Sequence, residues 1–335
     1  MQAPTRSADR TSTAHSTTSQ GTAQLLGGQR SGPTVSFELY PPRTDKGADT
    51  VRQAITELAP AEPDFFSVTY GAAGKTRDSS RELVRHVRAE TDITAVAHLT
   101  CVGASAQELR GVIDDLLDEG VRDFLALRGD PPAGQPEWRP HPQGLRRASE
   151  LVRLLRTMEA ERLGSPGWER AGIGPHPLSI SVAAYPGTAR DRRGNAVIDP
   201  RDVDALVEKQ EAGADFAITQ IFYDAAHYAA LVEQARRAGV HIPIVAGVIP
   251  LTDPRRLRKL HGLTGVEPPE GLLAELEGAG SRGEAYRIGQ EATRSLVGDI
   301  LQAGAPGLHI YTFNTATPAL DLLRGARLRP VPSAA

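Results

Sequence analysis

The sequence has only one cysteine among its 335 residues, Cys101, so no disulfide bond can form within the chain. A single thiol suits a reducing compartment, and we expect a cytoplasmic protein in which Cys101 is a small buried residue. The longest apolar runs cover about ten residues, whereas a transmembrane helix needs about twenty. The formal net charge of −3 and the pI near 6.3 provide no basic field for a polyanion. We therefore expect neither a membrane nor a nucleic acid as a partner.

Several motifs that identify enzyme classes are also missing. The nine histidines show no H-E-x-x-H or other ligand spacing, which argues against a metal site. No G-x-S-x-G elbow supports a serine hydrolase. The segment GAAGKT at 71–76 resembles a nucleotide phosphate loop, but Thr69 stands where that loop requires its first glycine. The RGD sequence at 128–130 is better explained as a turn at a strand end than as an adhesion signal.

What the chain does have is a regular alternation of apolar and amphipathic segments. Eight apolar runs predict strands, at 35–38, 65–71, 94–101, 123–130, 178–186, 216–224, 241–250 and 308–314. Helical periodicity lies between them, at 47–60, 80–90, 105–120, 145–164, 199–214, 224–239 and 252–263. Such an α/β pattern predicts a parallel sheet covered by helices, and eight units predict a (β/α)8 TIM barrel. The alternative, an open doubly wound sheet, lacks a G-x-G-x-x-G after the first run.

The predicted barrel is a single domain at residues 34–328. Residues 1–33 are rich in Ser, Thr, Gln, Gly and Ala and have few large apolar side chains, so we expect a disordered N-terminal tail. Residues 329–335 are expected to form a short C-terminal tail. An interruption of the repeat at 264–283 predicts a short helical insertion before the last unit.

Polar side chains stand where the predicted strands end, and in a barrel these ends meet at one mouth. Glu38 is followed by two prolines and Asp130 by a proline-rich loop, so helix capping explains neither residue. Two carboxylates at one mouth suit general acid chemistry, because burial can raise one pKa towards neutrality while the other group stays ionised. Thr69 and His98 end two further strands, and Gln220 adds an amide that can both donate and accept toward a heterocycle.

Six segments, in this order, resemble the methylenetetrahydrofolate reductase family: VSFELYPPR, DFFSVTYGAAG, AHLTC, ALRGDPP, VAAYP and GADFAITQIFYD. The resemblance covers residues 34–328. Members of this family are barrel enzymes that reduce 5,10-methylenetetrahydrofolate to 5-methyltetrahydrofolate with NADH or NADPH, usually through bound FAD. The resemblance therefore implies a folate-binding oxidoreductase of one-carbon metabolism and methionine synthesis.

The resemblance also implies roles for individual residues. Glu38 matches the family's general acid, which protonates a folate nitrogen so that the ring opens to an electrophilic iminium. Asp130 matches an aspartate near the pterin and the flavin, and Gln220 matches a pterin-contacting glutamine. The positions that match flavin contacts are Thr69, His98, Arg128, Gly129, Tyr185, Asp202 and Lys209, and those that match folate or nicotinamide contacts are Tyr311 and Phe313.

Several positions depart from the flavin-binding pattern of the family. Ala189 stands where a flavin-contacting histidine is expected, and Ala205 and Glu208 stand where asparagine and arginine are expected. A glutamate in place of a phosphate-facing arginine would repel the flavin pyrophosphate. Arg147 and Leu260 replace a tyrosine and a stacking phenylalanine. Two alternatives therefore stay open: bound FAD, or direct transfer of hydride from NADH or NADPH to the iminium.

Two other functions are compatible with a folate barrel. A catalytically silent folate-binding protein is expected to lack the acid, but Glu38 is present. Another folate-dependent one-carbon enzyme, such as a methyltransferase, needs a corrinoid or thiol-metal site that the sequence does not show. The sequence leaves open the choice between NADH and NADPH and the oligomeric state.

Overall fold

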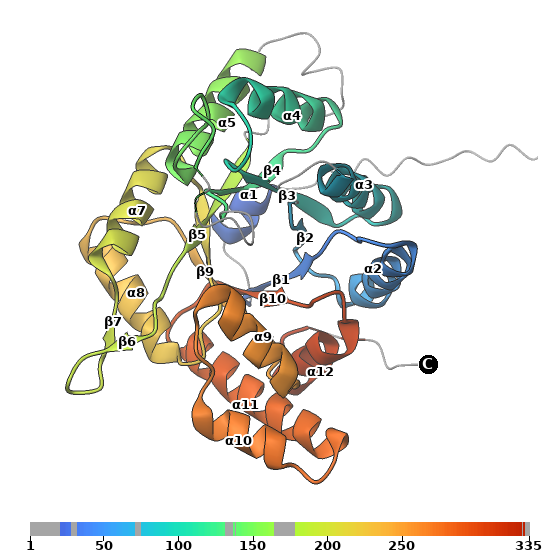
Figure 1. Cartoon of the computed structure of the whole chain (residues 1–335), viewed down its shortest axis with the longest axis vertical. Helices are drawn as coiled ribbons and strands as arrows, with labels where there is room; N and C mark the ends of the chain where they lie inside the picture. Colours follow the sequence, from blue (N-terminus) through green and yellow to red (C-terminus); the bar gives the residue numbers. More distant parts are fainter. Residues whose placement is uncertain are drawn as a thin grey trace, which may run out of the picture.

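The strands of the computed structural model close into a barrel (Figure 1). The structure describes residues 21–27, 32–70, 75–130, 137, 139–163, 178–329 and 331, with the backbone alone for 75–77. The strand bounds are β1 Thr34–Leu39, β2 Phe65–Val68, β3 Thr94–Thr100, β4 Asp123–Leu127, β5 Ser179–Ala184, β8 Phe216–Thr219, β9 Ile244–Val248 and β10 Gly307–Tyr311. They are parallel and follow the order β1-β10-β9-β8-β5-β4-β3-β2. The predicted (β/α)8 barrel is confirmed, with one strand at each apolar run.

Helices surround the barrel, as the periodicity predicts. Their bounds are α2 Asp45–Leu58, α3 Lys75–Glu90, α4 Ala106–Asp118, α5 Ala148–Arg162, α7 Pro200–Glu211, α8 Ala225–Arg237, α9 Pro254–Thr264 and α12 Ala316–Ala326, with a 3-10 turn at Ala59–Ala61. Side-chain caps begin several of them. The Asp199, Asp224 and Asp253 carboxylates accept backbone hydrogen bonds at the first turns of α7, α8 and α9. These caps satisfy N–H groups that a helix leaves unpaired, so the preceding loops end at defined residues.

A helical insertion lies between α9 and β10, where the interrupted repeat predicts it. It contains α10 Glu270–Gly278, and the long helix α11 Arg282–Gln302 follows. Figure 1 shows α9, α10 and α11 packed together on one side of the barrel. They share a small apolar core that includes Leu257, Leu260 and Leu276. This core supports α9, a helix that borders the barrel mouth.

Two apolar layers hold the barrel together. Phe65 and Phe216 pack inside it with aliphatic residues of neighbouring strands, and a larger cluster fills the space between the strands and the helices. Side chains two apart in a strand point to the same face. The strand register pairs Glu38 of β1 with Tyr311 of β10 and with Ser67 of β2. These polar residues therefore meet at one level of the barrel.

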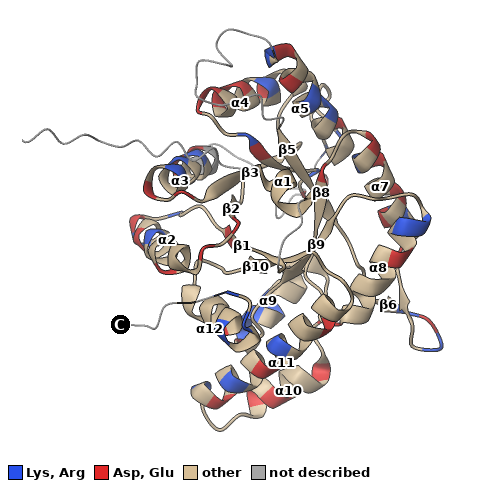
Figure 2. Ribbon diagram, turned by 180° about the vertical axis from the view of Figure 1, so that it is seen from behind, with Lys and Arg blue, Asp and Glu red and all other residues tan. Residues whose placement is uncertain are grey.

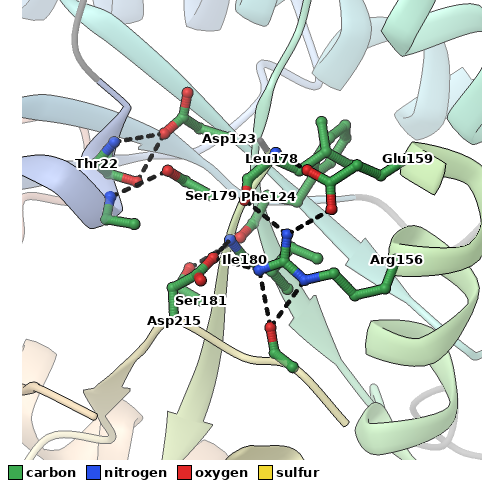
Figure 3. A network of polar contacts seen from close by, with 12 residues as sticks. Thr22, Asp123, Phe124, Arg156, Glu159, Leu178, Ser179, Ile180, Ser181 and Asp215 are labelled. Atoms are coloured by element: carbon green, nitrogen blue, oxygen red, sulfur yellow. Dashed lines mark hydrogen bonds and ion pairs between the residues drawn. The ribbon is translucent and has the colours of Figure 1, made fainter. Parts of the chain in front are cut away.

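A short helix, α1 Thr22–Gly27, lies at the N-terminal ends of β4 and β5. The N–H and the hydroxyl of Thr22 both donate to Asp123 Oδ1, at 2.8 and 2.7 Å, and the Ala23 N–H donates to Ser179 Oγ at 3.0 Å (Figure 3). Leu26 packs against the apolar residues inside the barrel. α1 therefore covers part of the barrel end opposite the mouth.

The expected tails need a correction. Residues 22–27 form the helix α1 within the expected N-terminal tail, because polar contacts to strands distant in the sequence compensate for the scarcity of large apolar side chains. At the other end of the chain, Arg329 forms an ion pair with Asp64 and Val331 packs against the core. Residues 1–20, 28–31, 330 and 332–335 lie outside the described residues.

A hairpin between β5 and α7 was not predicted. Its strands are β6 Ala189–Arg190 and β7 Ala196–Val197, paired antiparallel. In Figure 1 the hairpin projects away from the barrel. Ala189, which stands where a flavin-contacting histidine is expected, is exposed in β6, and its carbonyl oxygen lies 3.2 Å from His227 Nε2.

Candidate active site

A large cavity opens at the C-terminal ends of the strands, and its volume is about 1820 Å³. The residues that the sequence singled out all line it: Glu38, Thr69, His98, Arg128, Gly129, Asp130, Tyr185, Asp202, Lys209, Gln220, Tyr311 and Phe313. They lie at or just beyond the C-terminal ends of seven strands and on α7, so the closure of the barrel brings them together. Ligand pockets usually measure about 300–1,000 Å³, so this cavity has room for more than one ligand.

Glu38 lies in the wall of this cavity, with only 6% of its surface exposed. Beside it, His309 of β10 is completely buried, and its Nε2 lies 3.8 Å from Glu38 Oε2. Ser36 Oγ is 2.8 Å from His309 Nδ1, and Ser67 Oγ is 3.1 Å from Nε2. The two serines hold the imidazole ring against the carboxylate, because they contact both of its nitrogens.

The pKa of Glu38 shifts in the opposite direction from the one expected. Burial by itself raises this pKa, but His309, His98 and the Tyr40 hydroxyl stabilise the carboxylate and together hold its pKa below the usual value. In the protein without substrate, Glu38 is therefore ionised at neutral pH. Burial lowers the pKa of His98 to about 4, so this ring is neutral at the same pH.

Three buried polar atoms near the ends of β2 and β3 have no hydrogen-bond partner within the described part of the chain: Thr69 Oγ1, His98 Nε2 and Thr100 Oγ1. A buried polar group without a hydrogen bond lowers the stability of a protein, and such groups often bind a ligand or a water molecule. Gly129 follows β4 beside them, with a φ of +81°, and a Cβ there would lie 2.5 Å from Val102 Cγ2. Thr69 and His98 line this part of the cavity, which fits a flat heterocycle that carries hydrogen-bonding groups.

Tyr311 and Phe313 lie at the end of β10, the strand next to β1. The Tyr311 hydroxyl donates to the Thr219 carbonyl at 2.9 Å. This contact requires a glycine at position 247, because a Cβ there would lie 2.2 Å from the carbonyl oxygen and 2.8 Å from the Tyr311 ring. Phe313 stacks on Tyr40, with ring centroids 5.4 Å apart. Its φ of +52° is rare for a residue other than glycine, which indicates local strain at the site.

The α7 side of the mouth differs from a phosphate-binding surface. Glu208 accepts two hydrogen bonds from Arg147 NH1, at 2.7 and 2.9 Å, and so joins α7 to the start of α5. Lys209 is buried, donates to the Ala183 carbonyl at 2.7 Å and lies over the Tyr185 ring. Burial lowers the pKa of Lys209 to about 8. Glu208 is thus held beside the cavity by its ion pair, where the family pattern has a cation.

Asp130 and Gln220 line the same cavity as Glu38, the other carboxylate that the sequence predicts at this mouth. The Asp130 carboxylate is exposed, and its ion pair with Arg128, at 3.8 Å, is loose. It is not among the groups that shift the pKa of Glu38. The Gln220 side-chain oxygen accepts from the Ile221 N–H at 2.9 Å, which leaves its NH₂ group for a ligand.

Sequence reasoning missed His309, Ser36, Ser67 and Tyr40. A signal for them was present, because Ser36, Glu38 and Tyr40 are spaced by two, as are His309, Tyr311 and Phe313. This spacing places each set on one face of its strand. Ser67, inside an apolar run, carried no such signal.

Further features of the described residues bear on function. None of their helices is long and apolar enough to cross a membrane. No group of three or more His, Cys, Asp or Glu among them is placed to hold a metal ion. Cys101 is buried as expected, and burial raises the pKa of its thiol to about 12.

Comparison with known proteins places this geometry in a family. The sequence profile described as "Methylenetetrahydrofolate reductase" matches residues 26–326. The "5,10-methylenetetrahydrofolate reductase" of Escherichia coli is 30% identical over 299 residues, which cover 88% of this chain and 91% of that protein. The "Methylenetetrahydrofolate reductase (NADH) 1" of Zea mays is 28% identical over 310 residues, 89% of this chain and 50% of the maize protein.

A solved structure shares the fold. It is described as an uncharacterised protein from Clostridium thermocellum that binds two copies of 5-methyl-5,6,7,8-tetrahydrofolic acid. Its TM-score is 0.57 at 14% sequence identity, and the match covers 90% of this chain and 97% of the other. That likeness supports the barrel alone, whereas the family profile and the bacterial relative extend over most of both sequences. The chain belongs to the methylenetetrahydrofolate reductase family.

Proposed function

We infer that the protein reduces 5,10-methylenetetrahydrofolate to 5-methyltetrahydrofolate with hydride from a reduced nicotinamide nucleotide. The observation that carries this function is the buried carboxylate of Glu38 in the wall of a cavity large enough for two ligands, in a chain of this family. The exposed Asp130 and the amide of Gln220 offer polar contacts to the pterin at the same mouth.

The chemistry needs a proton and a hydride. Glu38, once protonated, gives its proton to a folate nitrogen, the C–N bond of the five-membered ring breaks and an iminium forms. A hydride from the nicotinamide then adds to the iminium carbon, which becomes the methyl group, and the nucleotide leaves in its oxidised form. Glu38 is ionised before substrate binds. A bound pterin removes water from the carboxylate, and this desolvation favours its protonated form.

His309 and Tyr40 position the acid in this proposal. His309 is fixed by Ser36 and Ser67 and stabilises the charged carboxylate until the proton is taken up. The Tyr40 backbone is clamped in turn: its N–H donates to Asn314 Oδ1 and its carbonyl accepts from Asn314 Nδ2, both at 2.9 Å. The carboxylate therefore has little freedom to turn away from the substrate.

We propose that FAD is not the resident cofactor. The unpaired atoms of Thr69 and His98, which line the cavity, fit any flat heterocycle, including a nicotinamide carboxamide. The phosphate end of a flavin fits less well, because Glu208 brings a carboxylate to the rim and occupies Arg147, the nearest cation on α5. Direct transfer requires both reactants in the cavity at once, and its volume of about 1820 Å³ is compatible with that.

The test is a purification without added flavin, followed by a visible spectrum and an assay of NADH and NADPH oxidation with 5,10-methylenetetrahydrofolate. We expect turnover in a protein whose visible spectrum shows no flavin absorbance. Stoichiometric flavin absorbance would overturn direct transfer but not the reductase. Absence of turnover, both with and without added FAD, would overturn the reductase itself.

A further inference from the structure

Four basic side chains border the cavity on one side, and we call them the basic rim: Arg43, Arg255, Arg256 and Lys259. Arg43 follows the two prolines after β1, and the other three belong to the first turns of α9. Figure 2 marks the basic residues of α9, a helix whose sequence PRRLRKLHGLT has no acid. The helical spacing of 255 and 259 places them on one face.

The charges of the basic rim are not neutralised by neighbours. None of the four takes part in an ion pair recorded for the described residues, whereas Arg258 on the same helix is paired with Glu277 of α10 at 2.7 Å. The nearest acid along the chain, Asp253, caps α9 and accepts from the Arg255 N–H at 2.9 Å. Glu38 faces the same cavity but is buried deep in its wall. The rim therefore has an excess of positive charge.

The part of the rim formed by α7 and the start of α5 is balanced. Arg147 is paired with Glu208 at 2.7 Å, and Arg201 with Asp199 at 2.6 Å. Charged residues of both signs lie along α7 (Figure 2). An anionic group that extends from the cavity is therefore attracted to the α9 side, where its charge is not already compensated.

One member of the basic rim is held in place by aromatic rings. The Arg256 guanidinium lies over the Phe313 ring, 5.0 Å from its centroid, and Phe313 stacks on Tyr40. A cation over an aromatic face is oriented, and its N–H groups at the edge stay available to an acceptor. Arg256 therefore lies between the Phe313 and Tyr40 rings, which line the cavity, and the exposed cations Arg255 and Lys259.

We propose that the basic rim is a subsite for the polyanionic end of a bound substrate, either a chain of γ-linked glutamate carboxylates on the folate or the phosphates of the nicotinamide nucleotide. The inference rests on the proposed function, because it requires a ligand whose ring end reaches the interior near Glu38. Flexible cations at the surface suit a tail of variable length, because each added charge finds another partner.

The experiment is a binding measurement, so that it does not depend on turnover. Isothermal titration compares the Arg255→Ala/Lys259→Ala protein with the native protein, using 5-methyltetrahydrofolate with one and with five glutamates, and NADH and NADPH. Both substituted residues are exposed, and equal thermal melting of the two proteins checks their folding. Arg258→Ala is the matched control, because it removes an exposed cation of α9 that is already paired.

We expect the double variant to lose about tenfold in affinity for one polyanion, with the control unchanged. A loss confined to the pentaglutamate, with the monoglutamate unaffected, identifies the folate tail as the ligand of the rim. A loss confined to NADPH, or shared by both nucleotides, identifies phosphate. Equal affinities of native and variant proteins for all four compounds would overturn the subsite. A native protein that binds folate but shows no turnover would instead contradict the proposed function and leave this comparison intact.

Discussion

The two ends of the barrel treat their polar groups differently. At the N-terminal end, Asp123 accepts from Thr22, and Arg156 pairs with Asp215 at 2.7 Å and with Glu159 at 2.8 Å (Figure 3). At the C-terminal end, Thr69, His98 and Thr100 keep buried atoms without partners. The N-terminal end also holds buried atoms without a partner among the described residues, Thr34 Oγ1 and Arg329 Nε, but they are separate from the paired network.

This difference separates stability from binding. At the N-terminal end most buried polar groups are paired, and breaking one of these hydrogen bonds or ion pairs leaves a buried group without its partner, which lowers stability. Unpaired groups at the other end lower the stability of the free protein and are compensated when a ligand supplies their partners. We therefore expect substitutions at the mouth to change turnover and substitutions at the closed end to change the free energy of unfolding.

The largest expected effect is at the mouth. Glu38→Gln removes the proton donor but keeps a side chain of the same size, so turnover should fall by about 10²-fold or more while folate binding and the melting temperature stay nearly unchanged. Steady-state assays, folate titration and thermal melting measure the three quantities. Unchanged turnover would remove Glu38 from its proposed role.

At the closed end, Asp123→Ala leaves the Thr22 N–H and hydroxyl without their acceptor. The free energy of unfolding should fall by about 2 kcal/mol, while turnover per folded molecule stays within about twofold. Urea unfolding and an assay of the folded fraction check both, with the exposed Asp92→Ala as control. An equal loss in the control, or no loss at Asp123, would show that α1 does not depend on this contact.

The pH dependence of catalysis tests the pKa of Glu38 in the free protein. Because this pKa is lowered and the acid must be protonated, kcat/KM should rise by about tenfold for each unit that pH falls between 8 and 6. kcat should depend on pH less steeply, because bound substrate desolvates the carboxylate. A kcat/KM that does not change over this range would mean that the proton comes from another group.

The smallest effect is expected for an unpaired hydroxyl at the C-terminal end of β3. Thr100→Val removes an atom that has no partner, so the free energy of unfolding should change by less than about 0.5 kcal/mol. Thr219→Val is the matched control in the same barrel, because its hydroxyl accepts from the Gly247 N–H at 2.8 Å, and its loss should cost about 1–2 kcal/mol. Equal costs in chemical unfolding would contradict the contrast between paired and unpaired groups.

Much of the site could be predicted from the chain, because strand ends of a barrel converge whatever their distance in the sequence. Glu38 and Gln220 are far apart in the sequence but line one cavity, and the apolar runs in which they lie can be recognised from the sequence alone. His309 lies inside an apolar run, and its spacing from Tyr311 indicates only the face of the strand. Its contacts with Ser36 and Ser67, which come from other strands, become visible only in the structure. The helix at 22–27 was missed because its stabilising partners belong to β4 and β5.

By itself, the sequence determined the barrel, the order of its units and the residues at its mouth, because these follow from the local periodicity of apolar side chains. Only the tertiary structure decided the charge states and the pairing. The pKa of Glu38 is lowered because His98 and His309 come from other strands. The charge of Glu208 is matched by Arg147 at the start of α5, while Arg255, Arg256 and Lys259 of α9 have no ion-pair partner among the described residues. Electrostatic interactions depend on distances in space, which no local pattern of residues specifies.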